Sequence, residues 1–169
     1  TIAGDVIMAD GKGIDFSAMT TPADATGMAA ETLKDYEEGV HTATLTCASS
    51  GGYNLSNSTL RYTKIGRLVT VQGYVIVVSE DGTPSGNLRL SLPFANAAGA
   101  EASGYAVGTV RFLRHGTTHA GAPVCQITGS AAYFQIAMTN DDGTEEYMDH
   151  DDVDTAFDLI VNITYMTAT

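Results

Sequence analysis

The chain is poor in basic residues and has no tryptophan. Among its 169 residues, 8 are Lys or Arg and 20 are Asp or Glu, which gives a net charge of −12. Such an excess of negative charge repels nucleic-acid phosphates and anionic membrane surfaces. No apolar run approaches the ~20 residues that cross a bilayer; the longest, Tyr74–Val78, has only the length of a strand. We therefore expect neither a nucleic-acid partner nor membrane insertion.

Cysteines and the common catalytic motifs are also scarce. Cys47 and Cys125 stand far apart and outside any Cys-x-x-Cys pair, so we predict two buried free thiols, with a disulfide between them as the alternative. The sequence contains no phosphate-binding glycine loop and no Gly-x-Ser-x-Gly elbow. His115 and His119 flank a Gly-Thr-Thr loop, which is not the helix that a zinc pair needs. We predict no catalytic residue, no cofactor and no metal site, and hence a protein that is not an enzyme.

Acidic side chains concentrate near the C-terminal end. The segment Asn140–Asp154 holds eight carboxylates in fifteen residues. Hard cations such as calcium prefer oxygen ligands, but the spacing does not match that of an EF-hand loop. We predict an exposed loop of mutually repelling charges between the last two strands. A bound cation is the first alternative, and a carboxylate pair for glycoside hydrolysis is the second.

The first 39 residues differ from the remainder. Asp5–Phe16 places two short apolar runs around an Asp-Gly turn, which predicts a β-hairpin. Met28–Glu38 is rich in helix formers and is followed by Gly39, which is typical of a short helix. Because a lone hairpin is only marginally stable in water, this stretch needs a partner. We predict an N-terminal stalk or attachment segment over residues 1–39 and a head domain over residues 40–169.

From Val40 onward the apolar residues alternate with polar ones, which is the period of β-strands. About eight short strands joined by Gly-rich turns predict an all-β fold, an antiparallel β-sandwich of the jelly-roll kind. The predicted strands are Val40–Ala48, Thr59–Ile65, Leu68–Val78, Leu88–Leu92, Tyr105–Leu113, Val124–Thr128, Ala132–Met138 and Ala156–Met166. The predicted core includes Val69, Val71, Leu90, Leu92, Ile136 and Ile163.

Four short segments follow one another in a recognisable order: Gly11–Ser17, Glu31–Gly39, Tyr62–Gly73 and Leu92–Phe94. The second reads Glu-Thr-Leu-Lys-Asp-Tyr-Glu-Glu-Gly, and the third begins Tyr-Thr-Lys-Ile-Gly-Arg. These two resemble the linker and the strand pair of structural proteins from the tail fibres and appendages of tailed bacteriophages, cyanophages among them. The first segment resembles the turn unit upstream of that linker. The resemblance does not extend beyond about Gly99.

The resemblance implies a non-enzymatic virion protein on the surface of a phage particle. It implies a β-sandwich head on a thin N-terminal stalk, usually a homotrimer, joined to other virion proteins through the N-terminal segment. The leading function is an appendage head that binds the host surface, either glycan or outer-membrane material. The alternative is a capsid decoration protein or head fibre anchored to the shell by its N-terminal segment. A polysaccharide depolymerase is a weaker alternative.

Glycan binding favours exposed aromatic side chains, and without tryptophan these have to be tyrosines. Tyr53, Tyr105 and Tyr147 are the candidates, but the interpretation that we favour for each is a partly buried strand or loop residue. Binding residues usually lie on loops held by a rigid scaffold. The long polar loops predicted at the ends of the head domain are Ala95–Gly104, Arg114–Pro123 and Asn140–Asp154.

Overall fold

The computed structural model describes residues 9, 12, 14–15, 32–33, 36–97, 104–114, 121–139 and 143–167. Within these ranges the regular structure is β-strand, apart from one 3₁₀ turn, and the predicted all-β class is confirmed. No helix in this part of the chain has the length and apolar character to span a bilayer. The elements are β1 (Ile14–Asp15), β2 (Thr32–Leu33), β3 (Glu37–Thr42), β4 (Leu45–Cys47), β5 (Ser50–Asn57), β6 (Thr59–Ile65), β7 (Leu68–Ser85), β8 (Leu88–Ser91), β9 (Tyr105–Leu113), β10 (Pro123–Thr128), β11 (Tyr133–Thr139), β12 (Glu145–Tyr147), η1 (His150–Asp152) and β13 (Asp158–Met166).

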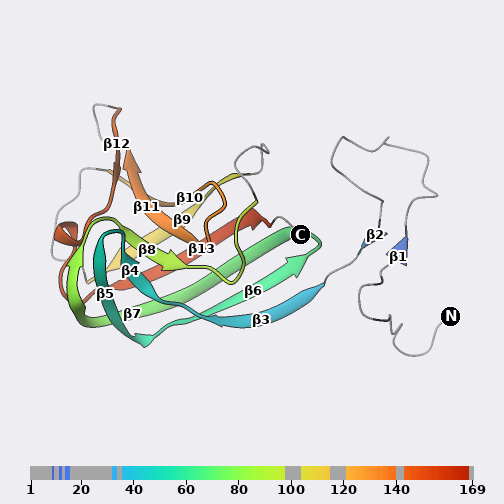
Figure 1. The fold of residues 1–169 in the computed structure, drawn as a ribbon, viewed down its shortest axis with the longest axis horizontal. Helices are drawn as coiled ribbons and strands as arrows, with labels where there is room; N and C mark the ends of the chain where they lie inside the picture. Colours follow the sequence, from blue (N-terminus) through green and yellow to red (C-terminus); the bar gives the residue numbers. More distant parts are fainter. Residues whose placement is uncertain are drawn as a thin grey trace.

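Eight of these strands form a closed antiparallel barrel (Figure 1). The order around the barrel is β13-β9-β10-β11-β8-β4-β5-β7, and β13 then pairs with β7 to close the ring. The closing ladder runs without a break from Asp158↔Ile76 to Met166↔Leu68. The predicted two-sheet sandwich is therefore not found. The alternation of apolar residues is the same in both architectures, so the sequence pattern alone does not separate them.

The strand β7 is the longest of the barrel, with 18 residues. Its first half pairs with β6 on one side and with β13 on the other, whereas its second half pairs with β5. A two-residue turn at Gly66-Arg67 joins β6 to β7, and Gly66 has a φ of 57° at the first turn position, where a type II′ hairpin turn needs glycine. The strand β3 extends the sheet beyond β6, and its other edge has no partner strand among the described residues.

The core lies inside the barrel and is built from alternate residues of each strand. On β13 the inward residues are Leu159, Val161, Ile163 and Tyr165, and each is at most 2% exposed. All six predicted core residues are buried, so that prediction is confirmed. The barrel interior also holds Phe134, Phe157, Leu45, Leu60 and Ile127.

Gly108 marks a place where two backbones approach closely. It lies on β9, where the ladder between β9 and β13 ends. A Cβ atom at this position would lie 2.8 Å from the Cα of Ile163 and 2.7 Å from its Cβ. An isolated glycine inside a strand pattern is typical of such a contact, because no larger residue fits.

The predicted N-terminal hairpin and helix fall largely outside the described residues. The described positions show β1 paired with β2 in a separate two-stranded sheet, with Ile14 opposite Leu33. The helix prediction for Met28–Glu38 is wrong at Thr32–Leu33, which form β2, and at its last two residues, which begin β3. Short isolated helices are marginal in water, and pairing of β3 with β6 supplies the backbone bonds at these last two positions instead.

Two isoleucines of β13 provide a matched test of the barrel. Ile163 is fully buried, whereas Ile160 is 44% exposed on the same strand. We expect Ile163→Ala to lower the free energy of unfolding by about 2–5 kcal/mol, because the removed atoms leave a cavity. Ile160→Ala should change it by less than ~1 kcal/mol. Denaturant unfolding measures both, and equal effects would show that the inward and outward faces of β13 are wrongly assigned.

Candidate functional site

The most developed surface of the described chain is the outward side of four neighbouring strands, β3, β6, β7 and β13, which we call the outer face. Strand register places its side chains in rows across the sheet. One row, the polar row, consists of Asn162, Gln72, Arg61 and Val40, in that order from β13 to β3. All four side chains are exposed. Amide and guanidinium groups thus stand side by side on a rigid support.

The rows on either side differ in character. On one side Ile160 of β13 pairs with Tyr74 of β7, which makes an apolar border. On the other side lies a row of hydroxyls, Thr164, Thr70 and Thr63, in which Thr164 and Thr70 are hydrogen-bonded at 3.0 Å. The outer face therefore changes from apolar to amide and then to hydroxyl within three rows.

The outer face is hollowed along the polar row. Two adjoining hollows of about 510 and 600 Å³ share Arg61 and Gln72. The first is also lined by Glu38, Val40 and residues of the hydroxyl row, and the second by Tyr74, Ile160 and Asn162. We call the two together the hollow. Each of the two has the size of a small-molecule site, and the polar side chains of Arg61 and Gln72 line both.

Tyr74 is held in place at one end of the hollow. Its hydroxyl donates to Oδ2 of Asp158 at 2.7 Å, and Nε of Arg114 donates to the same oxygen at 2.8 Å. A second Arg114 nitrogen, Nη2, pairs with Oδ1, so the guanidinium and the carboxylate form a bidentate pair. The side chain of Asp158 is only 5% exposed. The ring of Tyr74, 39% exposed, is therefore a fixed aromatic surface.

These contacts also shift the pKa values of Asp158 and Tyr74. Hydrogen bonds from Arg114 outweigh the burial of Asp158, and together with the Tyr74 hydroxyl they hold the pKa of this carboxyl below its usual value. The hydrogen bond to Asp158 in turn raises the pKa of Tyr74, so its hydroxyl remains a donor at neutral pH.

The tyrosines singled out in the sequence fare differently. Tyr53 is 7% exposed inside the barrel, edge-on to Phe157, so it is a buried strand residue and offers no platform for a glycan. Tyr105 is 64% exposed at the start of β9, and Tyr147 is half-buried on β12. Sequence reasoning missed Tyr74 because it stands in an apolar run, although its even spacing from Thr70 and Gln72 places it on the polar side.

The acidic segment is more ordered than a solvated loop. Its first three residues lie outside the described ranges, and Glu145–Tyr147 form β12, which pairs with β11. Met148 and Val153 are buried, and η1 lies between them. The prediction of an exposed loop is therefore wrong for this part, because two apolar side chains among the carboxylates anchor it to the barrel.

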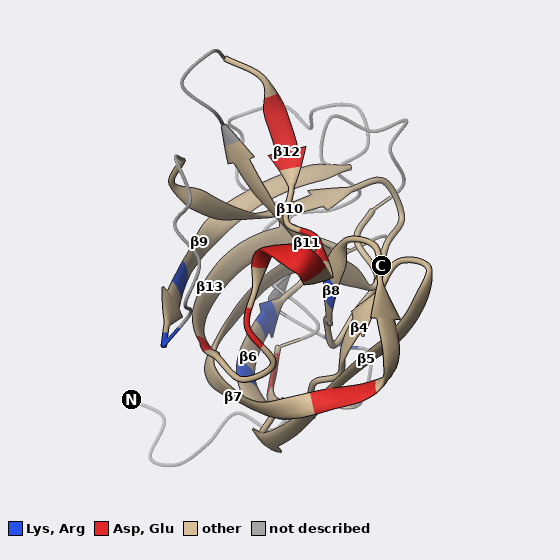
Figure 2. Cartoon of the chain, turned by 90° about the vertical axis from the view of Figure 1, so that its left-hand side faces the viewer, with Lys and Arg blue, Asp and Glu red and all other residues tan. Residues whose placement is uncertain are grey.

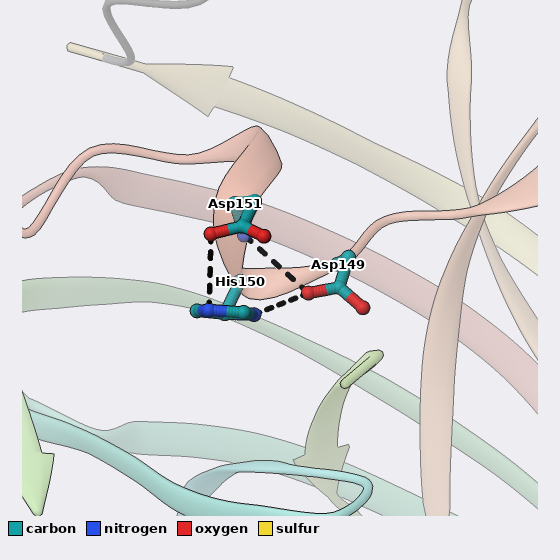
Figure 3. Close-up of side chains that lie close together, drawn as sticks. All are labelled: Asp149, His150 and Asp151. Atoms are coloured by element: carbon teal, nitrogen blue, oxygen red, sulfur yellow. Dashed lines mark hydrogen bonds and ion pairs between the residues drawn. The ribbon is translucent and has the colours of Figure 1, made fainter. Parts of the chain in front are cut away.

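Within this segment Asp149, His150 and Asp151 lie together (Figure 3), and each offers one ligand atom within 4.8 Å of the others. Nδ1 of His150 contacts Asp149, and Nε2 lies 3.0 Å from Asp151. The backbone N–H of Asp149 donates to the Asp152 carboxylate at 2.8 Å, and the Asp149 carboxylate accepts from the backbone N–H of Asp151, so these two bonds cap the 3₁₀ turn. Burial opposes ionisation of Asp149, but hydrogen bonds from His150 and from backbone N–H groups outweigh it and lower its pKa. The cluster could hold a cation only if His150 gave up one of its carboxylate contacts.

The cysteines and the other histidines either form no site with their neighbours or lie outside the described part of the chain. Both cysteines are free and buried, as predicted, and burial raises the pKa of Cys125 to about 12. His41 is half-buried and lies 2.9 Å from Oγ of Ser91. His115 and His119 are outside the described ranges, as are most of the first two predicted polar loops and the first three residues of the third.

Removal of the Asp158 carboxylate should destabilise the protein in a pH-dependent way. Because its pKa is lowered on folding, its contribution is present above the ordinary value of 3.8 and is lost as the pH falls through the folded-state pKa. We expect Asp158→Asn to cost about 1.5–3 kcal/mol at pH 7 and much less in strong acid. Unfolding at several pH values tests this, with the exposed Asp154→Asn as control. A cost that stays constant down to pH 2 would contradict the account.

Cations should act on the Asp149–Asp151 cluster only by screening. We expect calcium, magnesium and zinc chlorides to shift the melting temperature no more than sodium chloride of equal ionic strength, since screening depends on ionic strength alone. Thermal unfolding of the full chain measures this. A calcium- or zinc-specific rise at sub-millimolar concentration, abolished by His150→Ala, would instead establish a bound cation.

Comparison of the chain with protein-family models, with curated proteins and with solved structures finds no match. What the outer face can do therefore follows from its own side chains.

Proposed function

We propose that this chain is a non-enzymatic binding head that attaches a phage particle to a saccharide of the host surface through the hollow. The observation that carries the proposal is the in-register placement of Asn162, Gln72 and Arg61 beside the fixed ring of Tyr74. Planar polar groups can each hydrogen-bond two neighbouring hydroxyls. An aromatic face beside them offers apolar contact to the carbon side of a sugar ring.

The way in which the hollow is built also favours binding over catalysis. Its groups stand on paired strands whose opposite faces fill the core, so the backbone that carries them is fixed before a ligand arrives. Preorganisation of this kind lowers the entropic cost of binding. Neither cysteine is a suitable nucleophile, because burial raises the pKa of both thiols. The proposal accordingly includes no catalytic step.

The wider setting of the proposal is a homotrimeric appendage of a bacteriophage, following the resemblance of residues 11–94 to such proteins. Residues 1–39 would join the head to other virion proteins. The edge of β3 that has no partner strand within the described ranges supports assembly, because open strand edges tend to acquire a partner. Three heads on one stalk would combine weak contacts, and linked sites can gain about 10²–10⁴ in avidity.

The test is retention of the labelled full chain on immobilised bacterial envelope polysaccharides, cyanobacterial ones included, beside capture by empty phage capsids. We expect retention on at least one polysaccharide. Replacing both amides, with Gln72→Ala and Asn162→Ala, should weaken it at least tenfold, since two or more hydrogen bonds are lost.

Thr128→Ala on β10 is the matched control, because Thr128 is exposed on a barrel strand outside the hollow. Retention that survives the double substitution would remove the hollow from the proposal. Capture by capsids with no retention on any polysaccharide would favour the decoration protein, and release of reducing sugar would favour the depolymerase.

A further inference from the structure

The charges of this chain are distributed unevenly over the barrel. Acidic residues lie on β12, on η1 and towards the end of β7, among other places, whereas basic residues lie on β6, β8 and β9 (Figure 2). The charged residues that line the hollow are Arg61 and Glu38, and beyond its Tyr74 end Arg114 is paired with Asp158. The hollow is therefore close to neutral in a chain whose net charge is −12.

Arg61 differs from Arg114 in having no anion. The guanidinium of Arg114 is occupied by Asp158. Arg61 is exposed in the middle of the hollow, and among the described residues it has neither an ion pair nor a side-chain hydrogen bond. A protein with this many carboxylates offers arginines many partners, yet Arg61 pairs with none of those described. Its guanidinium lies between amides and hydroxyls, and its five N–H donors are available to a ligand.

We infer that the hollow takes an acidic saccharide, with the carboxylate of a uronic or ulosonic acid bound by Arg61 and the sugar ring lying towards Tyr74. This rests on the proposed function and deepens it. A planar guanidinium matches a carboxylate through two parallel hydrogen bonds. Gln72 lies directly opposite Arg61 and Asn162 directly beyond it, so both amides are placed for hydroxyls of the same ring.

The choice of a carboxylate over a phosphate follows from charge. One free guanidinium neutralises one negative charge, which is the charge of a uronate. A phosphate monoester brings about −1.5 to −2 at neutral pH, and the long-range field of this acidic chain opposes the surplus. The threonine row and the apolar border complete a surface suited to a hydroxyl-rich ring with one charged substituent.

The experiment uses an envelope polysaccharide that retains the full chain, before and after its carboxylates are reduced to alcohols with carbodiimide and borohydride. Reduction should abolish retention or weaken it about 10- to 100-fold, the value of a charge-assisted pair. Arg61→Gln should weaken binding to the untreated polysaccharide by a similar factor and add nothing after reduction. Arg61→Lys should restore only part of the affinity, because an ammonium cannot make the paired contact.

Arg111→Gln is the matched control. It removes the same charge from β9, outside the hollow, and should weaken binding less than about threefold, as expected for screened charges at a distance. Equal losses for Arg61→Gln and Arg111→Gln would show a diffuse field and overturn the direct contact. Full retention after carboxyl reduction would overturn the acidic ligand while leaving the proposed function intact. Absence of retention on every polysaccharide would overturn both.

Discussion

The pairing of β13 with β7 is the constraint on which the rest of the structure depends. It joins the last strand of the chain to the long strand β7 and closes the sheet into a barrel. Closure buries the inward row of β13 and removes two edges that would otherwise stay open. It also brings Asn162 beside Gln72 and Ile160 beside Tyr74, so the ladder that completes the core also assembles the outer face.

Carboxylates are stabilised in different ways at the acidic end of the barrel and on the outer face. At the mouth of the barrel, carboxylates are used locally, as caps of a 3₁₀ turn and as partners of His150. On the outer face the one buried carboxylate, Asp158, is neutralised by Arg114 and fixes a tyrosine ring. Separation of the two regions leaves Arg61 without an ion pair among the described residues of a strongly acidic protein.

Much of the fold could be predicted from the sequence, because period-two alternation identifies strands and their inward residues locally. Ile163 and Val71 were correctly predicted as core on that basis. Closure of the sheet was not predictable, since it depends on which strands pair and not on their pattern. The candidate site was not predictable for the same reason, because it too depends on strand pairing. Asn162 and Gln72 are 90 positions apart, and only the register of two strands makes them neighbours. Among the candidate tyrosines, the sequence could not separate the buried Tyr53 from the exposed Tyr105, because the exposure of a tyrosine is decided by the face on which it falls.

The alternation of β7 and β13 has a consequence for how this protein can evolve. Val71 and Ile163 fill the core, while Gln72 and Asn162, one step along each strand, are exposed on the outer face. Substitutions of these exposed side chains therefore leave no void in the core. The chemistry of the polar row can change with little effect on the fold, while selection for stability acts on the inward positions and on buried groups such as Asp158.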